Sequence, residues 1–336
     1  MSKIDFRNLK KTFIIAEIGN NHEGNFKIAK KLIQLAYKAK VDAVKFQTFN
    51  TEDFINKKDK KRFAQLKKFQ LTKKQFIELK NFAHSKRLKF ISTPLDINSA
   101  DFLIKNSDII KIASSDNNFF PMIDRIILSK KNVIISTGLV DINDIVFLKN
   151  RIYKLIGKEL AHKRVAFLHC VTSYPVQDKF ANLNSVNFLI DKLNFKIGYS
   201  DHTLGLDSAF VAVSMGAKII EKHFTIDKNF SNFRDHSLSA DFKEMREMVE
   251  KIRKIELIKG KYQKKIQICE KNFLKTVRRS AYAANQIKRG ELLNLKNTKF
   301  LRSENSKNFF NIKSIIGKKL IKSVEKGRKI VKKNLI

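Results

Sequence analysis

The segment KIGYSDHTLG, residues 196–205, begins like a buried β-strand and ends in polar chemistry. Ile197 and Tyr199 are spaced as apolar residues on one face of a strand are. Four consecutive hydrogen-bonding side chains then follow, namely Ser200, Asp201, His202 and Thr203. A short apolar strand that finishes in this way predicts that the strand ends where the protein opens into a pocket.

The surrounding sequence alternates regularly between strand-like and helix-like segments from residue 12 to about residue 258. The β-rich runs cover residues 12–19, 42–48, 88–93, 108–114, 132–137, 164–170, 195–200 and 217–224. Helix-period segments lie between most of them, including residues 26–40, 73–86 and 141–156, and a last helix is expected near 241–258. Eight strands with intervening helices predict an α/β fold, a parallel (β/α)₈ TIM barrel. A doubly wound open sheet is the alternative, but no glycine-rich turn follows the first strand.

The remaining sequence predicts a second, smaller domain. Residues 259–275 are rich in lysine and are expected to form a linker after the barrel domain, residues 1–258. Residues 276–336 carry short apolar runs and turn signals at Lys288-Arg289-Gly290 and Glu325-Lys326-Gly327. We therefore expect a small β-rich domain at residues 276–336.

The charge of the chain is strongly positive. The 336 residues include 69 Lys and Arg against 32 Asp and Glu, a formal net charge of +37. A nucleic-acid-binding protein is one reading of this number, and it predicts tight, steeply salt-dependent binding. However, the lysines occur on nearly every amphipathic segment instead of gathering in one tract. We favour a generally basic surface, which also attracts small acidic substrates.

Other global features indicate a cytoplasmic protein. No apolar run approaches the roughly 20 residues that a membrane-spanning helix needs, and the first apolar run is interrupted by Glu17. The two cysteines, Cys170 and Cys269, fit a reducing compartment and provide no disulfide framework.

Polar side chains stand at the ends of all eight predicted strands, where TIM barrels carry their catalytic groups. In strand order they include Glu17, Asn20, Asn21 and His22; Lys45 and Gln47; Ser92 and Thr93; Lys111, Ser114, Ser115 and Asp116; Ser136 and Thr137; His169, Thr172, Ser173 and Tyr174; Ser200, Asp201 and His202; and Glu221 and His223. Their accumulation at one end of the barrel predicts an active site.

Two histidines at adjacent strand ends indicate a metal site. His202 and His223 can converge on one divalent cation, and imidazole suits Mn²⁺, Fe²⁺, Co²⁺ and Zn²⁺. Either histidine alone is more simply explained as a hydrogen-bonded core residue. The pair at matched depth favours a metal whose remaining positions are open to water and substrate.

Two lysines lie in strands that otherwise face the barrel interior. Burying Lys45 or Lys111 is costly without an anionic partner. Each could form a structural ion pair, for example Lys111 with Asp116, and a Schiff-base aldolase with a reactive lysine is a rival reading. Because serine and threonine hydroxyls flank both lysines, we favour a binding site for phosphate and carboxylate groups.

These residues lie in motifs that closely resemble the sialic acid synthase family. The motifs are IIAEIGNNHEGN, AVKFQTF, FISTP, KIASSD, STG, LHCVTSYP, IGYSDHTLG and EKHFT, in family order from about residue 13 to 240. The segment AYAANQIKRGELLNLKNTKFLR resembles the small C-terminal SAF (antifreeze-like) domain of that family. The resemblance implies a transferase that condenses phosphoenolpyruvate with an N-acylmannosamine-type sugar. It also implies a homodimer in which each SAF domain caps the partner's barrel.

The resemblance assigns roles to individual residues. Phosphoenolpyruvate would be held by Lys45, Thr93, Lys111, Ser114, Thr172, Ser200 and His202. The metal, usually manganese, with magnesium or cobalt as alternatives, would be bound by His202 and His223. The amino sugar would face Glu17, Gln47, Tyr174 and Asp235, together with Arg302 of the partner subunit. Glu17 is also expected to act as the general acid or base.

Three departures from the family pattern concern the sugar. Ser303-Glu304-Asn305 follows Arg302 where the family usually continues with Pro-Gly. The segment 51–71 between the second and third strands is shortened, so that a sugar-binding residue expected there has no clear counterpart. SNFRDHSLS, residues 231–239, replaces the more usual Gly-Pro-Asp-His form. The exact acceptor sugar is therefore left open.

Overall fold

Eight parallel strands form a closed barrel, and neighbouring strands pair in sequence order from β1 to β8. The computed structural model describes residues 4–302 and 312–336, and the chain divides into two units, residues 1–260 and 261–336. The barrel strands are β1 (Phe13–Gly19), β2 (Ala43–Thr48), β3 (Lys89–Pro94), β4 (Ile109–Ile112), β5 (Asn132–Ser136), β6 (Val165–Cys170), β7 (Lys196–Asp201) and β8 (Ile219–His223). The predicted TIM barrel is confirmed.

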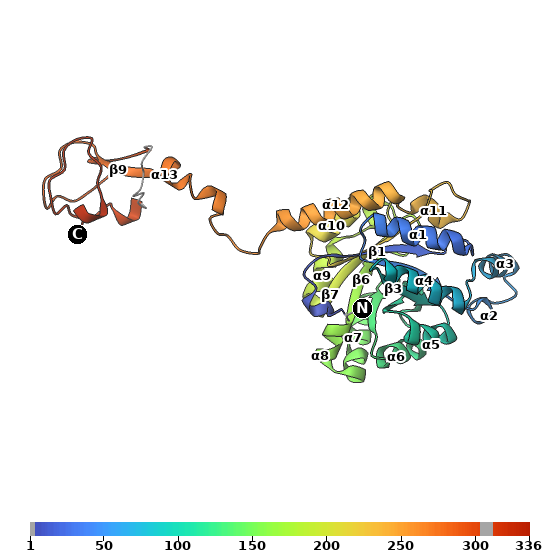
Figure 1. Cartoon of the computed structure of the whole chain (residues 1–336). Coiled ribbons are helices and arrows are strands. Elements are labelled where there is room, and N and C mark those ends of the chain that lie inside the picture. The colour runs from blue at the N-terminus through green and yellow to red at the C-terminus, as the bar shows by residue number, and fades with distance from the viewer. Residues whose placement is uncertain (1–3, 303–311) are drawn as a thin grey trace. The chain divides into compact units, whose positions relative to one another are not determined.

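Helices surround the barrel in the N-terminal unit (Figure 1). They are α1 (Phe26–Lys38), α2 (Thr51–Phe54), α3 (Lys60–Phe69), α4 (Lys73–Ser85), α5 (Ile97–Asn106), α6 (Phe120–Leu128), α7 (Ile142–Ile156), α8 (Lys158–Arg164), α9 (Asn184–Leu193), α10 (Asp207–Ser214), α11 (Arg234–Leu238) and α12 (Phe242–Lys259). Single 3₁₀ turns are η1 (Phe6–Asn8), η2 (Ser114–Asp116) and η3 (Asp178–Phe180). In α1, the buried residues Ala29, Leu32 and Ile33 form one apolar stripe, as helical spacing predicts.

The barrel interior is apolar at one end and polar at the other. Inward-facing residues near the strand starts, such as Ile15, form a buried apolar cluster that Phe6 of η1 covers. Two positions further along β1 the inward residue is Glu17. The same change occurs between Ile91 and Thr93, between Ile109 and Lys111, and between Ile134 and Ser136. The lower layer therefore stabilises the barrel, and the upper layer is free to carry chemistry.

The C-terminal unit is small and contains a two-stranded antiparallel sheet. β9 (Arg279–Ala283) pairs with β10 (Thr298–Arg302), and α13 (Leu274–Val277) precedes them, after η4 (Ile268–Glu270). Further 3₁₀ turns are η5 (Ile312–Ser314) and η6 (Lys332–Asn334). Its core consists of Ala281, Ala283, Ile287, Leu293, Ile315, Leu320, Val324 and Ile330. The predicted small β-rich domain is present.

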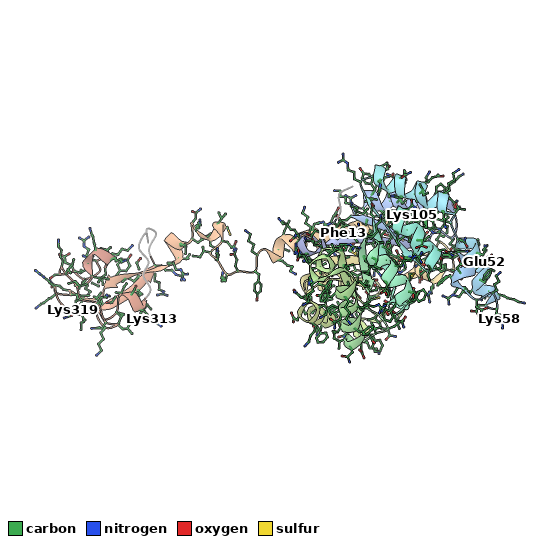
Figure 2. All side chains as sticks on the ribbon, turned by 90° about the horizontal axis from the view of Figure 1, so that it is seen from below. Phe13, Glu52, Lys58, Lys105, Lys313 and Lys319 are labelled. Atoms are coloured by element: carbon green, nitrogen blue, oxygen red, sulfur yellow. The ribbon has the colours of Figure 1, made fainter. Side chains whose placement is uncertain are left out.

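Basic side chains project from the surface of both units. Lys58 and Lys105 of the first unit and Lys313 and Lys319 of the second are examples (Figure 2). Within residues 4–302 and 312–336, no helix is long and apolar enough to cross a membrane.

Candidate active site

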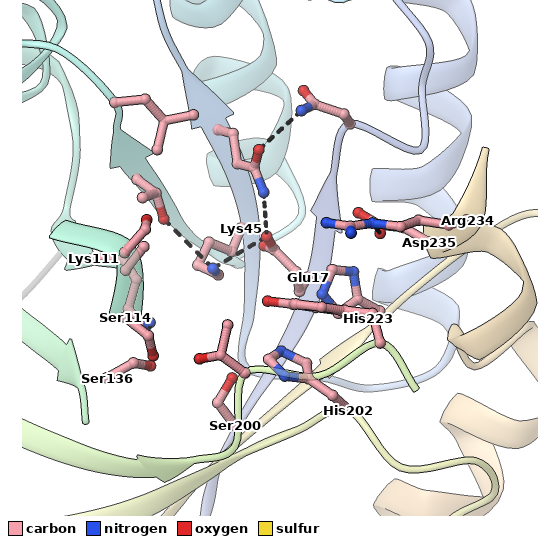
Figure 3. A pocket seen from close by; sticks show the side chains of 18 of the residues that line it. Glu17, Lys45, Lys111, Ser114, Ser136, Ser200, His202, His223, Arg234 and Asp235 are labelled. Carbon is pink, nitrogen blue, oxygen red and sulfur yellow. Dashed lines mark hydrogen bonds and ion pairs between the residues drawn. The ribbon is translucent and has the colours of Figure 1, made fainter. Parts of the chain in front are cut away.

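A cavity of about 710 Å³ opens at the carboxyl ends of the barrel strands. It is lined by every site residue that the sequence predicts within residues 1–260: Glu17, Lys45, Gln47, Thr93, Lys111, Ser114, Thr172, Tyr174, Ser200, His202, His223 and Asp235. Figure 3 shows Lys111, Ser114 and Ser136 on one side of the cavity and Arg234 and Asp235 on the other. This volume lies within the range of ordinary ligand pockets, about 300–1,000 Å³.

Two lysines and two glutamates form a buried cluster in the cavity, which we call the lysine–glutamate cluster (Glu17, Lys45, Lys111 and Glu221). Lys45 Nζ lies 3.1 Å from Glu17 Oε1 and 3.3 Å from Glu221 Oε1. Lys111 Nζ lies 3.8 Å from Glu221 Oε1. Both lysines are thus compensated by carboxylates, as their burial requires.

The suggested ion pair of Lys111 with Asp116 is wrong, because the partner of Lys111 is Glu221. The carboxylate of Asp116 accepts a hydrogen bond from Ser115 Oγ at 2.8 Å. Lys111 Nζ instead donates to Ser136 Oγ at 2.6 Å and faces Glu221. The sequence located Glu221 at a strand end without giving it a role. Alternation along β8 turns it inward with His223, and this signal could have identified it.

The environments of the two glutamates drive their pKa values apart. Burial raises the pKa of Glu17 to about 7, against the opposing effect of Lys45. Burial also acts to raise the pKa of Glu221, but Lys111 and Lys45 outweigh it and lower the value to about 2. Glu221 is therefore the permanent anion of the cluster, whereas Glu17 can gain or lose a proton near neutral pH. Two carboxyl groups separated in this way are typical of an acid–base site.

The two histidines approach each other as predicted. The ring centroids of His202 and His223 are 5.5 Å apart. His202 Nδ1 faces the carbonyl oxygen of Val171 at 2.9 Å, so that in the neutral ring this nitrogen carries the proton and Nε2 keeps its lone pair. His223 Nδ1 is buried without a hydrogen-bond partner. Burial and the neighbouring His202 lower the pKa of His223 well below its usual value, so the ring is a neutral ligand.

This donor set suits a divalent cation with an incomplete protein coordination sphere. In the part of the chain that the structure describes, no three His, Cys, Asp or Glu side chains gather into a metal site. His202 and His223 would therefore supply two neutral nitrogens and leave the other positions to water or substrate. The orphaned nitrogen of His223 is the observation that fits such an ion best.

The other side of the cavity carries donors and acceptors suited to a polyol. Asn20 Nδ2 donates to Gln47 Oε1 at 2.9 Å, and Gln47 Nε2 faces Glu17 Oε1 at 3.5 Å. The Arg234 guanidinium stacks over the ring of Tyr174 at 4.7 Å and pairs with Asp235 at 3.3 Å. Arg234 was not among the predicted residues, although it lies in the segment 231–239 that departs from the family pattern.

The segment 51–71 contributes to the site despite being short. Helix α3 lines the cavity with Arg62, Gln65 and Leu66, and α2 adds Phe54. The spacing of the three α3 residues places them on one face of the helix. The sequence did not identify these four residues, because they lie on helices and not at the strand ends.

Some polar residues at the strand ends do not line the cavity but fix the loops around it. Asn21 Nδ2 donates to the carbonyl oxygen of Phe224 at 2.9 Å. His169 Nε2 lies 2.8 Å from the carbonyl oxygen of Ala181. His22 is buried, and its Nδ1 accepts from the backbone of Gly24 at 3.0 Å.

His22 should make stability depend on pH. Burial lowers its pKa to about 4 from 6.5, so the folded protein keeps the ring neutral while the unfolded chain takes up a proton below pH 6.5. Its stabilising contribution is therefore complete above pH 6.5 and is lost as the pH falls towards 4, at about 1.4 kcal/mol per pH unit. His22→Asn keeps an acceptor for Gly24 and cannot titrate. Urea unfolding at several pH values should show a shallower loss for this variant, and parallel curves would contradict the assignment.

Arg302 lies at the end of β10 in the C-terminal unit and is exposed. The following residues, Ser303-Glu304-Asn305, lie outside the described part of the chain. The role of Arg302 at the partner's sugar, and the homodimer that it requires, stay predictions.

Comparisons with known proteins place the chain in a family. A model described as the NeuB family matches residues 32–264, and a SAF domain model matches residues 278–336. An uncharacterised protein of Methanocaldococcus jannaschii is 42% identical over 292 residues, which cover 87% of this chain and 85% of its own. The N,N'-diacetyllegionaminic acid synthase of Campylobacter jejuni is 35% identical over 92% of this chain and 96% of its own length.

A solved structure agrees with this placement. The N-acetylneuraminic acid (sialic acid) synthetase of Leptospira borgpetersenii, crystallised with citrate, superposes with a TM-score of 0.73 and is 34% identical. The match covers 79% of this chain and 90% of that one. The chain therefore belongs to the NeuB family, the sialic acid synthase family that its motifs predict, and it is an enzyme with a C-terminal SAF domain.

Proposed function

We propose that this enzyme joins phosphoenolpyruvate to the aldehyde carbon of an open-chain N-acylmannosamine-type sugar and releases inorganic phosphate. The observation that carries the proposal is the meeting of the lysine–glutamate cluster and the two imidazoles in one cavity. The names of the Campylobacter and Leptospira relatives, a synthase and a synthetase of nonulosonic acids, support it.

The donor substrate would lie against Lys111 and the hydroxyl groups beside it. Phosphoenolpyruvate carries a phosphate and a carboxylate, and Lys45, Lys111, Thr93, Ser114 and Ser200 supply the matching cationic and hydroxyl donors. When Glu17 is protonated, the cluster holds two positive lysines and one negative carboxylate, that of Glu221, and therefore retains a net positive charge. Donors held in place before substrate arrives are the usual means of stabilising charge in a transition state.

The reaction balances with one water. A carbon–carbon bond forms between the terminal carbon of phosphoenolpyruvate and the aldehyde carbon, while water adds to the neighbouring carbon. The tetrahedral centre then breaks its carbon–oxygen bond to phosphate, and phosphate leaves with the bridging oxygen. Glu17, whose pKa is about 7, would transfer the protons that these steps require. A divalent cation, manganese by resemblance or else magnesium or cobalt, would be held by His202 and His223 and would polarise the aldehyde oxygen.

The acceptor would be oriented by Gln47, Tyr174 and Asp235 on the far side of the cavity. Two sugar classes fit the proposal, N-acetylmannosamine and its dideoxy-diacetamido relatives. The name of the Campylobacter relative favours the second class.

Phosphate release tests the proposal directly. Purified enzyme is given phosphoenolpyruvate and each sugar in turn, with Mn²⁺ or with chelator, and the nine-carbon (nonulosonic) product is identified by mass. We expect phosphate release that needs both the sugar and the metal, with bridging ¹⁸O from labelled phosphoenolpyruvate recovered in phosphate. Two results would instead establish a Schiff-base aldolase: product formation from pyruvate in place of phosphoenolpyruvate, and a covalent adduct of pyruvate with a lysine after borohydride reduction.

Gly138 should be needed for donor binding. A Cβ at this position would lie 2.4 Å from Thr172 Oγ1 and 2.7 Å from Ser114 Oγ, which accepts from Gly138 N at 3.1 Å. Gly138→Ala therefore displaces two hydroxyls of the donor site. We expect the KM for phosphoenolpyruvate to rise about 5- to 100-fold, the effect of losing one or two hydrogen bonds. Steady-state kinetics measures this. Gly157→Ala, which strains a backbone of φ +75° with nothing within 4 Å of the added Cβ, is the control for destabilisation away from the cavity and should leave this KM unchanged. An unchanged KM would contradict the placement of the donor.

A further inference from the structure

An ion pair lies between the barrel and its helices, directly beside the two histidines but outside the cavity. Asp201 precedes His202 on β7, and Lys222 precedes His223 on β8; the two side chains are 0% and 1% exposed. Alternation along the strands turns both to the outer face of the barrel, where Tyr199 and other residues form an apolar layer with the helices. Charges in such a layer are costly, and replacing them with apolar residues often stabilises a protein. The pair therefore calls for an explanation other than stability.

Lys222 contacts the two residues that flank His202 in the sequence, Asp201 and Thr203. Its Nζ donates to Asp201 Oδ2 at 2.9 Å and to the carbonyl oxygen of Thr203 at 2.6 Å. Asp201 Oδ1 in turn accepts from the backbone and hydroxyl of Thr203, at 2.9 and 2.8 Å, and from Tyr199 OH at 3.3 Å. Lys222, which precedes His223, thus binds both sequence neighbours of His202.

The backbone does not connect the two histidines in the same way. The register between β7 and β8 ends with Asp201 opposite Lys222. Beyond this point the carbonyl oxygen of His202 accepts from Val176 N at 2.9 Å, whereas that of His223 accepts from Ala240 N at 2.8 Å. These bonds tie the histidines to different loops. The contacts of Lys222 with Asp201 and Thr203 therefore link β7 to β8 on the outer face of the barrel, whereas Ser200 Oγ donates to Glu221 Oε1 at 2.9 Å on the inner face.

We infer that Asp201 and Lys222 are positioning residues, which hold His202 and His223 at the separation needed for both to bind one cation. The inference rests on the proposed metal-dependent function. Neither residue lines the cavity, so neither is expected to contact substrate. Metal–imidazole bonds tolerate little variation in length, so a small relative shift of the two strands weakens binding.

The test removes the link and measures metal binding. In full-length protein, the double variant Asp201→Asn, Lys222→Met removes both charges with little change in volume and leaves no single buried charge. Mn²⁺ binding is followed by electron paramagnetic resonance, and Co²⁺ binding by visible absorption. We expect the dissociation constant of each metal to rise about 10- to 100-fold, as for other residues that orient metal ligands. The Co²⁺ spectrum should change as well.

A milder variant covers the case in which the double variant does not fold. Thr203→Val keeps the ion pair and removes one hydroxyl contact with Asp201. It should weaken metal binding about 2- to 10-fold, in proportion to the loss of one hydrogen bond. Unchanged metal binding in the folded variants would overturn the positioning role and leave the proposed function intact.

Asp42→Asn is the control for loss of a hydrogen-bonded, half-buried carboxylate away from the site. Asp42 lies before β2, at the opposite end of the barrel, where it accepts from Ile14 N at 2.8 Å and from Arg253 at 2.9 Å. This control should lower the melting temperature without changing metal affinity. If it weakened metal binding as much as the double variant, general destabilisation would explain the result and the inference would fail. Wild-type protein that bound neither metal would overturn the inference together with the metal assignment on which it rests.

Discussion

We expect His223→Ala to lower kcat in the presence of Mn²⁺ by at least about 10³-fold, because a Lewis acid contributes several kcal/mol to charge stabilisation in a transition state. His223 Nδ1 has no hydrogen-bond partner, and burial and His202 keep the ring neutral. The variant therefore loses no hydrogen bond made by His223 Nδ1 within the protein. The decisive comparison is the response to chelator: wild-type activity should disappear, whereas the residual activity of the variant should not change.

A histidine remote from the cavity supplies the control. His84 on α4 pairs with Asp108 at 2.8 Å and does not line the cavity, so His84→Ala should keep both the rate and the metal dependence. Circular dichroism and thermal unfolding would show whether each variant remains folded. A His223→Ala enzyme that condenses its substrates at nearly the wild-type rate in chelator would refute the metal assignment.

The sequence predicted those features that follow from local pattern and position along a strand. Lys45 and Lys111 were recognised because a charged residue in an otherwise apolar, inward-facing run is unusual. His202 and His223 were paired because they end adjacent strands of the predicted barrel. In each case the periodicity of the strand and the topology of the fold together fix where the side chain points.

Features that depend on which residues meet across the fold could not be predicted in the same way. Glu221 was visible at a strand end, but its role depends on the distance to two lysines from other strands. In the polar run at residues 200–203, Ser200 and His202 face the cavity. Asp201 faces outward and meets Lys222, and no local pattern identifies that partner. Likewise, Arg62 lines the cavity from α3, a helix away from the strand ends.

Lys111→Met should lower kcat/KM for phosphoenolpyruvate by about 10²- to 10³-fold, the usual effect of removing one preorganised donor to developing negative charge. Methionine is similar in length and apolar, so the layer around residue 111 stays filled. Glu221 keeps Lys45 at 3.3 Å and the hydroxyl of Ser200 at 2.9 Å, which limits the cost of leaving that carboxylate with one lysine fewer.

The same substitution should shift the pH profile in a definite direction. The positive charge of Lys111 lowers the pKa of Glu17, which is about 7 in the intact cluster, so its removal must raise that pKa. If the ionised form of Glu17 is required, the acidic limb of the kcat/KM profile moves to higher pH in Lys111→Met and is absent in Glu17→Gln. Lys105→Met, on the exposed surface of α5, changes the net charge equally and should alter neither the rate nor the profile. Among the described residues that line the cavity, only Lys45 and Lys111 have an ammonium within 4 Å of Glu221. A Lys111→Met enzyme with wild-type kcat/KM would therefore contradict the placement of phosphoenolpyruvate against Lys111.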